Sequence, residues 1–424
     1  MTQDAGLALA GSGTDTTLPA NLIEGLAELA VRTGLNLQPG QDLVMTAPVT
    51  ALPLVRAITR AAYRAGAGLV TPLLSDREIT LARFAHGSEA SFDRAPGWLY
   101  DGMAQAFDAG AARLALVGED PMLMAGQDSE KLGRANRANA LAYRPALAAI
   151  SGFHINWSII SCPTSDWARR MFPDLPPEQA VAALAEAIRV TARLDQPDPV
   201  AAWSAHNAAL ARRCAMLNAA RFDALHFRAP GTDLRVGLAE GHFWQGGASE
   251  ARNGVRCNPN IPTEEVFTTP HAAQVDGHVR ATKPLSHQGA LIEEIEMRFE
   301  NGQAVSARAA QGDDVLRQML ATDAGAARLG EVALVPHSSP VSQTGHLYFN
   351  TLFDENAASH IAMGQCYSSC LEKGETLSKE EIAARGGNES LIHVDWMIGS
   401  DRMDVDGLRA GSAPVPLMRR GEWV

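Results

Sequence analysis

Two ionisable side chains, His393 and Asp395, lie two residues apart inside the apolar segment NESLIHVDWMIGSD, residues 388–401. The apolar run has the length of a buried strand rather than a helix. Side chains two apart on a strand share one face, with Cα atoms roughly 6.7 Å apart, so these two can bind one metal ion or each other. The opposite face carries Ile392, Val394, Trp396 and Ile398. Because burying an unpaired charge is costly, the segment predicts either a metal site or a His–Asp hydrogen bond in the core.

A second histidine stands in FDENAASHIAMGQCYSSCLEKG. The spacing predicts a helix that Asp354 or Asn356 caps, with His360, Gly364 and Tyr367 on one stripe at i, i+4 and i+7. A glycine inside a helix costs about 1 kcal/mol relative to alanine, which indicates that something approaches the backbone there. A small polar pocket and a packed helix with a core histidine and tyrosine are equally consistent with this pattern.

Three glutamates are further candidates. In RLGEVALVP, Glu331 shares a strand face with Ala333 and Val335, an unusual place for a charge unless it is bound or lies at an exposed strand end. In NPNIPTEEVFTTP, Glu264 and Glu265 stand between turn residues and point to opposite sides if the segment is extended. For Glu264 and Glu265 the alternative is a solvated loop acid.

Composition limits the partners that such a site could serve. The chain has 424 residues with a formal net charge of -12, and 46% of its residues are hydrophobic, which is typical of a globular protein large enough for two or three domains. The acidic charge argues against nucleic-acid and anionic-membrane surfaces. The five cysteines are scattered and form no CxxC, so we expect reduced thiols, a cytoplasmic location and no thiolate zinc site.

Two kinds of organisation follow one another along the chain. Residues 1–18 are small and polar, and we expect a flexible tail. In residues 19–220, helices are predicted to alternate with strands at 42–48, 68–74 and 112–118, which indicates an N-terminal α/β domain around a parallel sheet. Residues 221–424 are rich in strands and turns, including a hairpin turn at Asn301 and Gly302. They predict an α+β domain with a mainly antiparallel sheet.

Several blocks resemble the thermophilic-aminopeptidase family of metallopeptidases. They are NIPTEEVFTTP, VRATKPLSHQGALIE, LGEVALVPHSSPVSQTG, YFNTLFDENAASHIAMGQCY, SLIHVDWMIGSD and RRGEWV, with LQPGQDLVMTAP and APGWLYDGMAQAFDAGA nearer the start. The resemblance runs from about residue 20 to the end. It implies a cytoplasmic, homodimeric aminopeptidase whose C-terminal catalytic domain holds two divalent ions (zinc, cobalt or magnesium) and whose substrates are peptides with a free N-terminus.

Residue by residue, the resemblance implies a set of metal ligands. They are Glu265, Glu331, His360, His393 and Asp395. Tyr367 matches the active-site tyrosine of the family. The sequence barely separates Glu265 from Glu264 as the ligand of its block, and Glu264, if it is free of metal, is a candidate proton carrier.

The number of ligands agrees with this resemblance. Two histidines and three carboxylates exceed the needs of one zinc ion and suit two ions about 3.5 to 4 Å apart, with Glu331 or Glu265 bridging. The expected chemistry is hydrolysis of the first peptide bond by a metal-activated water, with Tyr367 donating to the developing oxyanion.

Three alternatives belong to other classes. His360, His393 and Asp395 alone satisfy the two-histidine, one-carboxylate pattern of mononuclear iron enzymes, including ring-cleaving dioxygenases, although one iron would leave both glutamates unexplained. A related amide hydrolase that acts on small molecules and a non-catalytic, metal-stabilised binding protein are the other two.

Overall fold

The computed structural model describes residues 18–287 and 289–424, so the predicted tail over residues 1–18 lies outside the described residues except for Leu18. A five-stranded parallel sheet has the strand order β2-β1-β3-β4-β9. The strands are β1 Leu43–Pro48, β2 Val70–Ser75, β3 Ala112–Val117, β4 Trp157–Ser161 and β9 Asn260–Ile261. The parallel sheet and its first three strands, which the sequence predicts, are confirmed.

Helices cover both faces of this parallel sheet. The helices of the first half are α1 Ala20–Leu29, which a π-helical turn extends to Gly34, α2 Leu52–Arg64, α3 Arg77–His86, α4 Gly97–Asp108, α5 Ser129–Ser151, α6 Ser165–Met171, α7 Pro177–Thr191 and α8 Pro199–Ala220. Of these, α3 buries no residue, and α8 packs mainly into the core of the second half. Leu43 and Met45 pack with α1, α2 and α7 on one face, while Val44 packs with α4 and α5 on the other. Alternate strand residues thus build two cores.

The second half of the chain is built on antiparallel sheets. The larger has the order β15-β14-β11-β6-β5-β19-β20-β21 and the smaller the order β10-β16-β17-β18. The strands of the larger are β5 Ala224–Ala229, β6 Thr232–Leu238, β11 Pro270–Arg280, β14 Glu296–Glu300, β15 Gln303–Arg308, β19 Asp404–Leu408, β20 Val415–Arg419 and β21 Glu422–Trp423. Asn301 and Gly302 connect β14 to β15 with positive φ angles of 48° and 78°, so the predicted hairpin turn is confirmed.

The smaller sheet consists of β10 Val266–Thr268, β16 Leu329–Leu334, β17 His360–Gly364 and β18 His393–Met397. Short elements complete the second half: the two-stranded pairs β7 Ser249–Glu250 with β8 Arg256–Cys257 and β12 Leu285–His287 with β13 Ala290–Ile292, and the helices α9 Asp313–Leu320, α10 Pro340–Gln343, α11 Thr351–Asp354 and α12 Lys379–Ala384.

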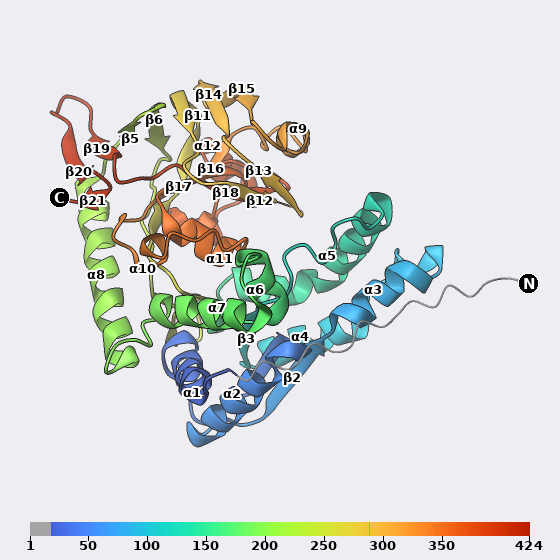
Figure 1. Cartoon of the computed structure of the whole chain (residues 1–424). Coiled ribbons are helices and arrows are strands. Elements are labelled where there is room, and N and C mark those ends of the chain that lie inside the picture. The colour runs from blue at the N-terminus through green and yellow to red at the C-terminus, as the bar shows by residue number, and fades with distance from the viewer. Residues whose placement is uncertain (1–17, 288) are drawn as a thin grey trace, which may run out of the picture.

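The two halves share structure. In Figure 1, α6 and α7 lie between the blue elements of the first half and the orange segment that contains α10 and α11, and α7 contacts α10. Strand β9 comes from the second half yet joins the parallel sheet, and Tyr348 and Phe353 belong to the core of the first half. The division at residue 220 therefore stays a prediction. No helix in the described ranges is both long and apolar enough to cross a membrane.

The predicted helix through His360, Gly364 and Tyr367 is wrong. The segment forms β17, which pairs with β16 on one side and β18 on the other, and all five of its residues are buried. As a central strand, the segment makes its backbone hydrogen bonds to neighbours on both sides, so it can be fully buried. Gly364 has φ +104°, and a Cβ there would lie 2.1 Å from the Ile392 carbonyl oxygen. The glycine therefore admits the backbone beside the next strand rather than a pocket.

Candidate metal centre

The smaller antiparallel sheet gathers four polar side chains on one face. Residues directly opposite one another on antiparallel strands point the same way, and the register places Asp395 opposite Ala362 and Ala362 opposite Glu331. His360 and His393 lie on the same face in the neighbouring rows, opposite Ala333 and Gly364 respectively. The other face packs into the core through Val332, Ile361, Val394 and Trp396. One face of the sheet therefore provides chemistry while the other anchors it.

Five side chains form two overlapping groups of ligand atoms, each within 4.8 Å. In the first, His360 Nε2 lies 3.1 Å from Glu265 Oε2 and 3.7 Å from Glu331 Oε1. In the second, His393 Nε2 lies 3.3 Å from Glu331 Oε2 and 3.4 Å from Asp395 Oδ1. Glu331 belongs to both groups through different oxygens. This geometry suits a carboxylate that bridges two ions.

The outer nitrogens of both histidines fix the orientation of the rings. His360 Nδ1 lies 3.1 Å from the Ala358 carbonyl oxygen, and His393 Nδ1 lies 2.7 Å from that of Gln365. Because a carbonyl oxygen only accepts, each Nδ1 must donate, and each Nε2 of the neutral ring then presents a lone pair to the carboxylates. Lone pairs that face one another at these distances need a positive charge between them, either a proton on the ring or a metal ion.

The buried polar atoms fit a metal-binding role. Glu265 Oε2, His393 Nε2 and Asp395 Oδ1 are buried and have no hydrogen-bond partner within the described chain. Orphaned buried polar atoms are rare in folded proteins, and each one calls for an explanation. Their convergence on one sheet face, with imidazole and carboxylate donors, matches the ligands of zinc, cobalt or similar divalent ions.

The carboxylates of the centre raise the pKa of both histidines. Burial opposes the charged form of His393, but the negative charges of Asp395 and Glu331 raise its pKa to about 11. Burial likewise opposes protonation of His360, but the neighbouring carboxylates of Glu265 and Glu331 raise its pKa well above the usual range. Without a metal ion, both rings are therefore protonated at neutral pH, and a bound metal would replace these protons.

Metal binding should release protons and strengthen as pH rises. A histidine must lose its proton to bind a metal, and the raised pKa of His393 keeps that proton on the ring up to about pH 11 in the metal-free chain. Chelator competition at about pH 6 and about pH 8 should therefore show tighter Co²⁺ binding at the higher pH. Calorimetry in buffers of different ionisation enthalpy should report the released protons, and pH-independent affinity would contradict this expectation.

Tyr367 follows β17 and lies at the edge of the centre. Its ring centroid is 4.6 Å from that of His393, and the side chain is 45% exposed. Partial burial, followed by the charges of Glu331 and Asp395, raises the pKa of its phenol well above the usual range. The hydroxyl therefore keeps its proton at neutral pH and can act as a hydrogen-bond donor.

The structure separates Glu264 from Glu265. Glu265 lies in the first ligand group, whereas Glu264 points elsewhere and receives two hydrogen bonds from Arg193 at 2.7 and 2.9 Å. Successive side chains of an extended segment point to opposite sides, as the sequence suggests for this pair.

One acid near the centre escaped the sequence analysis. Glu355 lies in a 3-10 turn, Glu355–Ala357, that contacts β18, and its side chain is partly exposed. Burial, followed by the charges of Glu265 and Asp395, raises its pKa well above the usual range. Among the described residues it makes no ion pair, and its Oε1 accepts a long hydrogen bond of 3.4 Å from Asn356 Nδ2. In the sequence, the position of Glu355 five residues before the candidate ligand His360 could have pointed to it.

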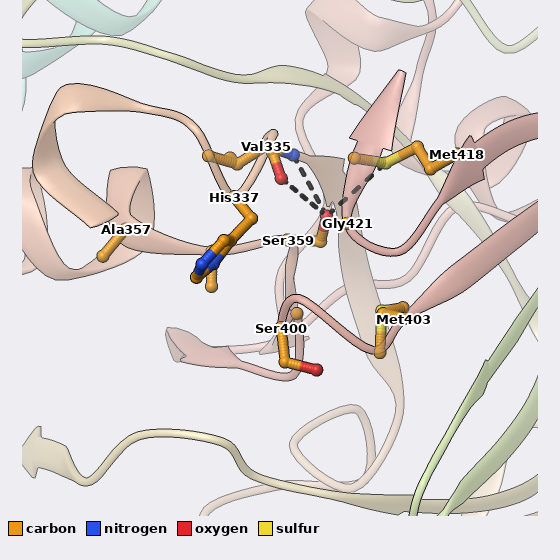
Figure 2. Close-up of a pocket in the computed structure, with 10 residues that line it drawn as sticks. Val335, His337, Ala357, Ser359, Ser400, Met403, Met418 and Gly421 are labelled. Carbon is orange, nitrogen blue, oxygen red and sulfur yellow. Dashed lines mark hydrogen bonds between the residues drawn. The ribbon is translucent and has the colours of Figure 1, made fainter. Parts of the chain in front are cut away.

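A small hollow of about 230 Å³ lies at the ends of the same strands. Figure 2 shows His337, Ser359 and Met418 among its lining side chains, and none of the five clustered ligands lines it. Ser359 Oγ accepts from the Val335 N–H at 3.1 Å and lies 3.2 Å from the Val335 carbonyl oxygen. These bonds tie the end of β16 to the residue before His360 and help to place that histidine.

Comparison with known proteins agrees with a metal centre. A family model described as thermophilic metalloprotease (M29) matches residues 20–423. The chain is 57% identical over 402 residues to aminopeptidase T of Thermus thermophilus, covering 95% of this chain and 98% of the relative. It is 45% identical over 401 residues to aminopeptidase 2 of Geobacillus stearothermophilus, covering 95% and 97%.

Solved structures extend the comparison. Wild-type AmpT from Thermus thermophilus superposes with a TM-score of 0.90 at 56% identity, covering 95% of this chain and 99% of that one. A 2,5-dihydroxypyridine dioxygenase from Pseudomonas putida KT2440 has a TM-score of 0.51 at 13% identity, with 96% and 98% covered, which shows a shared fold alone. With a family model that spans nearly the whole chain and relatives this similar, the chain belongs to the thermophilic metalloprotease (M29) family.

Proposed function

We propose that this protein is a metal-dependent aminopeptidase that removes the N-terminal residue from peptides at a centre of two divalent ions. The observation that carries the proposal is the pair of overlapping ligand groups joined by Glu331. The 57% identity to an aminopeptidase T over almost the whole chain supports the same activity. We further propose zinc, cobalt or magnesium as the ions, a homodimer as the assembly and the cytoplasm as the location. Five free, buried cysteines suit a reducing compartment.

In this proposal Glu265, Glu331 and His360 hold one ion, and Glu331, His393 and Asp395 hold the other. The bound ions would supply an activated water and polarise the carbonyl of the first peptide bond. Tyr367 keeps its phenolic proton and donates it as a hydrogen bond to the oxygen that becomes negative.

The remaining task is to carry a proton from the attacking water to the leaving amine. Both oxygens of Glu264 are held by Arg193, so that carboxylate is poorly placed for the proton-carrying role suggested by its sequence position. Glu355 is near the centre, partly exposed and without an ion pair among the described residues. We therefore propose Glu355 for proton transfer in place of Glu264.

The dioxygenase alternative has less support. Among the described residues, His360 does not group with His393 and Asp395; each histidine instead groups with Glu331. A single iron would leave Glu265 and Glu331 unpaired on a buried face. The likeness to a dioxygenase at 13% identity concerns the fold alone.

Metal analysis combined with substrate hydrolysis tests the proposal. Purified protein should contain two divalent ions per chain and release the N-terminal residue from a panel of aminoacyl amides and short peptides, and chelator should abolish that release. One bound iron with oxygen consumption would overturn the proposal. Hydrolysis of small amides without any cleavage of peptides would favour the amide-hydrolase alternative.

Replacing Tyr367 with phenylalanine should lower kcat by roughly 10²- to 10³-fold, because it removes one oxyanion donor. Metal content and KM should change little, since the hydroxyl belongs to neither ligand group. Steady-state kinetics and metal analysis of the same sample check both points. Tyr63→Phe is the matched control for loss of a tyrosine hydroxyl, because Tyr63 is 47% exposed and lies on α2, where its hydroxyl accepts from the Val70 N–H at 3.2 Å. Full activity of Tyr367→Phe would remove this role.

A further inference from the structure

A buried ion pair joins the helical layer of the first half to the segment that carries Glu265. Arg193 Nη1 lies 2.7 Å from Glu264 Oε1, and Nη2 lies 2.9 Å from Oε2, so the pair is bidentate. The side chains are 12% and 3% exposed. Such a fork fixes the plane of the carboxylate as well as its position.

The arginine is itself held in place. Arg193 lies two residues beyond the end of α7, and its guanidinium stacks 4.8 Å over the ring of Trp203 on α8. Trp203 is fully buried, and its indole N–H donates to the Ala192 carbonyl oxygen at 2.9 Å. The cation therefore belongs to a rigid corner between two helices rather than to a mobile surface.

The backbone on either side of the Glu264 carboxylate is also fixed. His206, on α8, lies with Nε2 2.8 Å from the Thr263 carbonyl oxygen, to which the ring N–H donates. The backbone N–H of Glu264 donates to Asn356 Oδ1 at 2.6 Å. Three contacts from three different parts of the chain thus restrain Thr263 and Glu264.

The next residue is the metal ligand. Glu265 points away from the Arg193 side, and its Oε2 lies 3.1 Å from His360 Nε2. Asn356, which restrains Glu264, lies four residues before His360 and is fixed through its own bonds to Leu352 and Ser339. Two of the three residues of the first group, Glu265 and His360, are therefore placed by a shared framework.

Stability alone does not account for this arrangement. A buried ion pair commonly contributes no more to folding than an apolar pair of similar size, because both charges lose their hydration. Metal ligands, by contrast, depend on accurate placement, and removing the groups that orient them typically costs 10- to 100-fold in metal affinity or activity.

We propose that Arg193 and Glu264 are positioning residues that hold the carboxylate of Glu265 in the metal centre, so that the α7–α8 corner acts on a site built by the C-terminal sheet. This role rests on the proposed metal centre and not on the substrate. Neither residue binds an ion or touches the reacting atoms.

Metal binding in two variants tests the proposal. Glu264→Gln removes the charge with almost no change of shape, and Arg193→Lys keeps the charge but loses the fork. Titration with Co²⁺ alone should show roughly 10- to 100-fold weaker binding of one ion in each variant, the other ion being little affected, with an altered visible spectrum of bound Co²⁺. At saturating Co²⁺, kcat should fall while KM stays close to wild type.

Glu186→Gln is the matched control. It breaks the exposed pair with Arg189 on the same helix, α7, and should leave metal binding and kinetics unchanged. Thermal unfolding of every variant establishes that the fold is retained, and Arg193→Lys answers the question if Glu264→Gln does not fold. Co²⁺ affinity and spectrum within twofold of wild type in a folded variant would overturn the positioning role. If the wild-type protein binds Co²⁺ but releases no N-terminal residue, the aminopeptidase proposal fails. The comparison of Co²⁺ affinity between wild type and variants still tests the positioning role.

Discussion

Replacing Glu331 with alanine is expected to abolish activity, with a loss of kcat/KM of roughly 10⁶-fold or more, which is the low end of enzymatic rate enhancements. The reason is its place in both ligand groups: Oε1 lies 3.7 Å from His360 Nε2, and Oε2 lies 3.3 Å from His393 Nε2. Removing it should weaken the binding of both ions together. Metal analysis after dialysis, alongside hydrolysis of an aminoacyl substrate, measures both effects in one preparation.

Two further variants make the Glu331 result interpretable. Glu331→Gln keeps the volume of a side chain that is buried on β16, and it should lose metal while retaining the unfolding temperature of the metal-free wild type. Glu300→Ala, at an exposed position on β14, should behave like wild type. If Glu331→Ala kept two ions per chain, Glu331 would leave the ligand set and the dinuclear proposal would lose its main support.

Local patterns predicted the parts of the fold that depend on neighbouring residues. The hairpin turn predicted at Asn301 and Gly302 connects β14 to β15. Alternation along a strand put His393 and Asp395 on one face, with Val394 and Trp396 behind them, and the structure confirms that strand. Period-two patterns work here because each strand packs one of its faces into a core.

The spacing of His360, Gly364 and Tyr367 misled for a physical reason. A separation of four and then three residues matches a helical stripe, but the segment is apolar and short enough to be a central strand, and its neighbours in space decide between the two. Those neighbours, β16 and β18, lie far away in the sequence. The glycine was read correctly as a place of close approach, although the approaching group is the Ile392 backbone.

Contacts between distant segments were out of reach of sequence reasoning. Arg193 meets Glu264 across 71 positions, and Glu264 meets Asn356 across 92. In the sequence, an arginine that follows a helix carries no local pattern that would connect it to a glutamate in another segment. Likewise, Glu355 resembles a capping acid beside Asp354 until β18 is seen to pack against its turn.

The substitution Glu355→Gln is expected to lower kcat by about 10²- to 10⁴-fold, the usual contribution of a general acid or base. Glutamine keeps the size and the hydrogen bonding of the side chain but cannot accept and return a proton. Glu355 belongs to neither ligand group, so the variant should bind both ions with wild-type affinity. Stopped assays at saturating substrate give kcat, and Co²⁺ titration gives the affinity.

The pattern across kinetic constants separates proton transfer from recognition of the substrate's free amine. If Glu355 carries the proton, Glu355→Gln lowers kcat at nearly constant KM, and Glu355→Asp recovers part of the rate because the carboxylate returns on a shorter side chain. If Glu355 instead holds the ammonium group, KM rises, and the substitution slows hydrolysis of N-acetylated substrates less than that of substrates with a free amine.

Asp354→Asn is not a suitable control, since Asp354 accepts backbone hydrogen bonds from Tyr348 and Asn350 that hold the preceding loop. Glu389→Gln, which breaks an exposed pair with Lys379, is the better one, because it removes a carboxylate close to β18 in sequence without touching either ligand group. An unchanged kcat in Glu355→Gln would return proton transfer to another group.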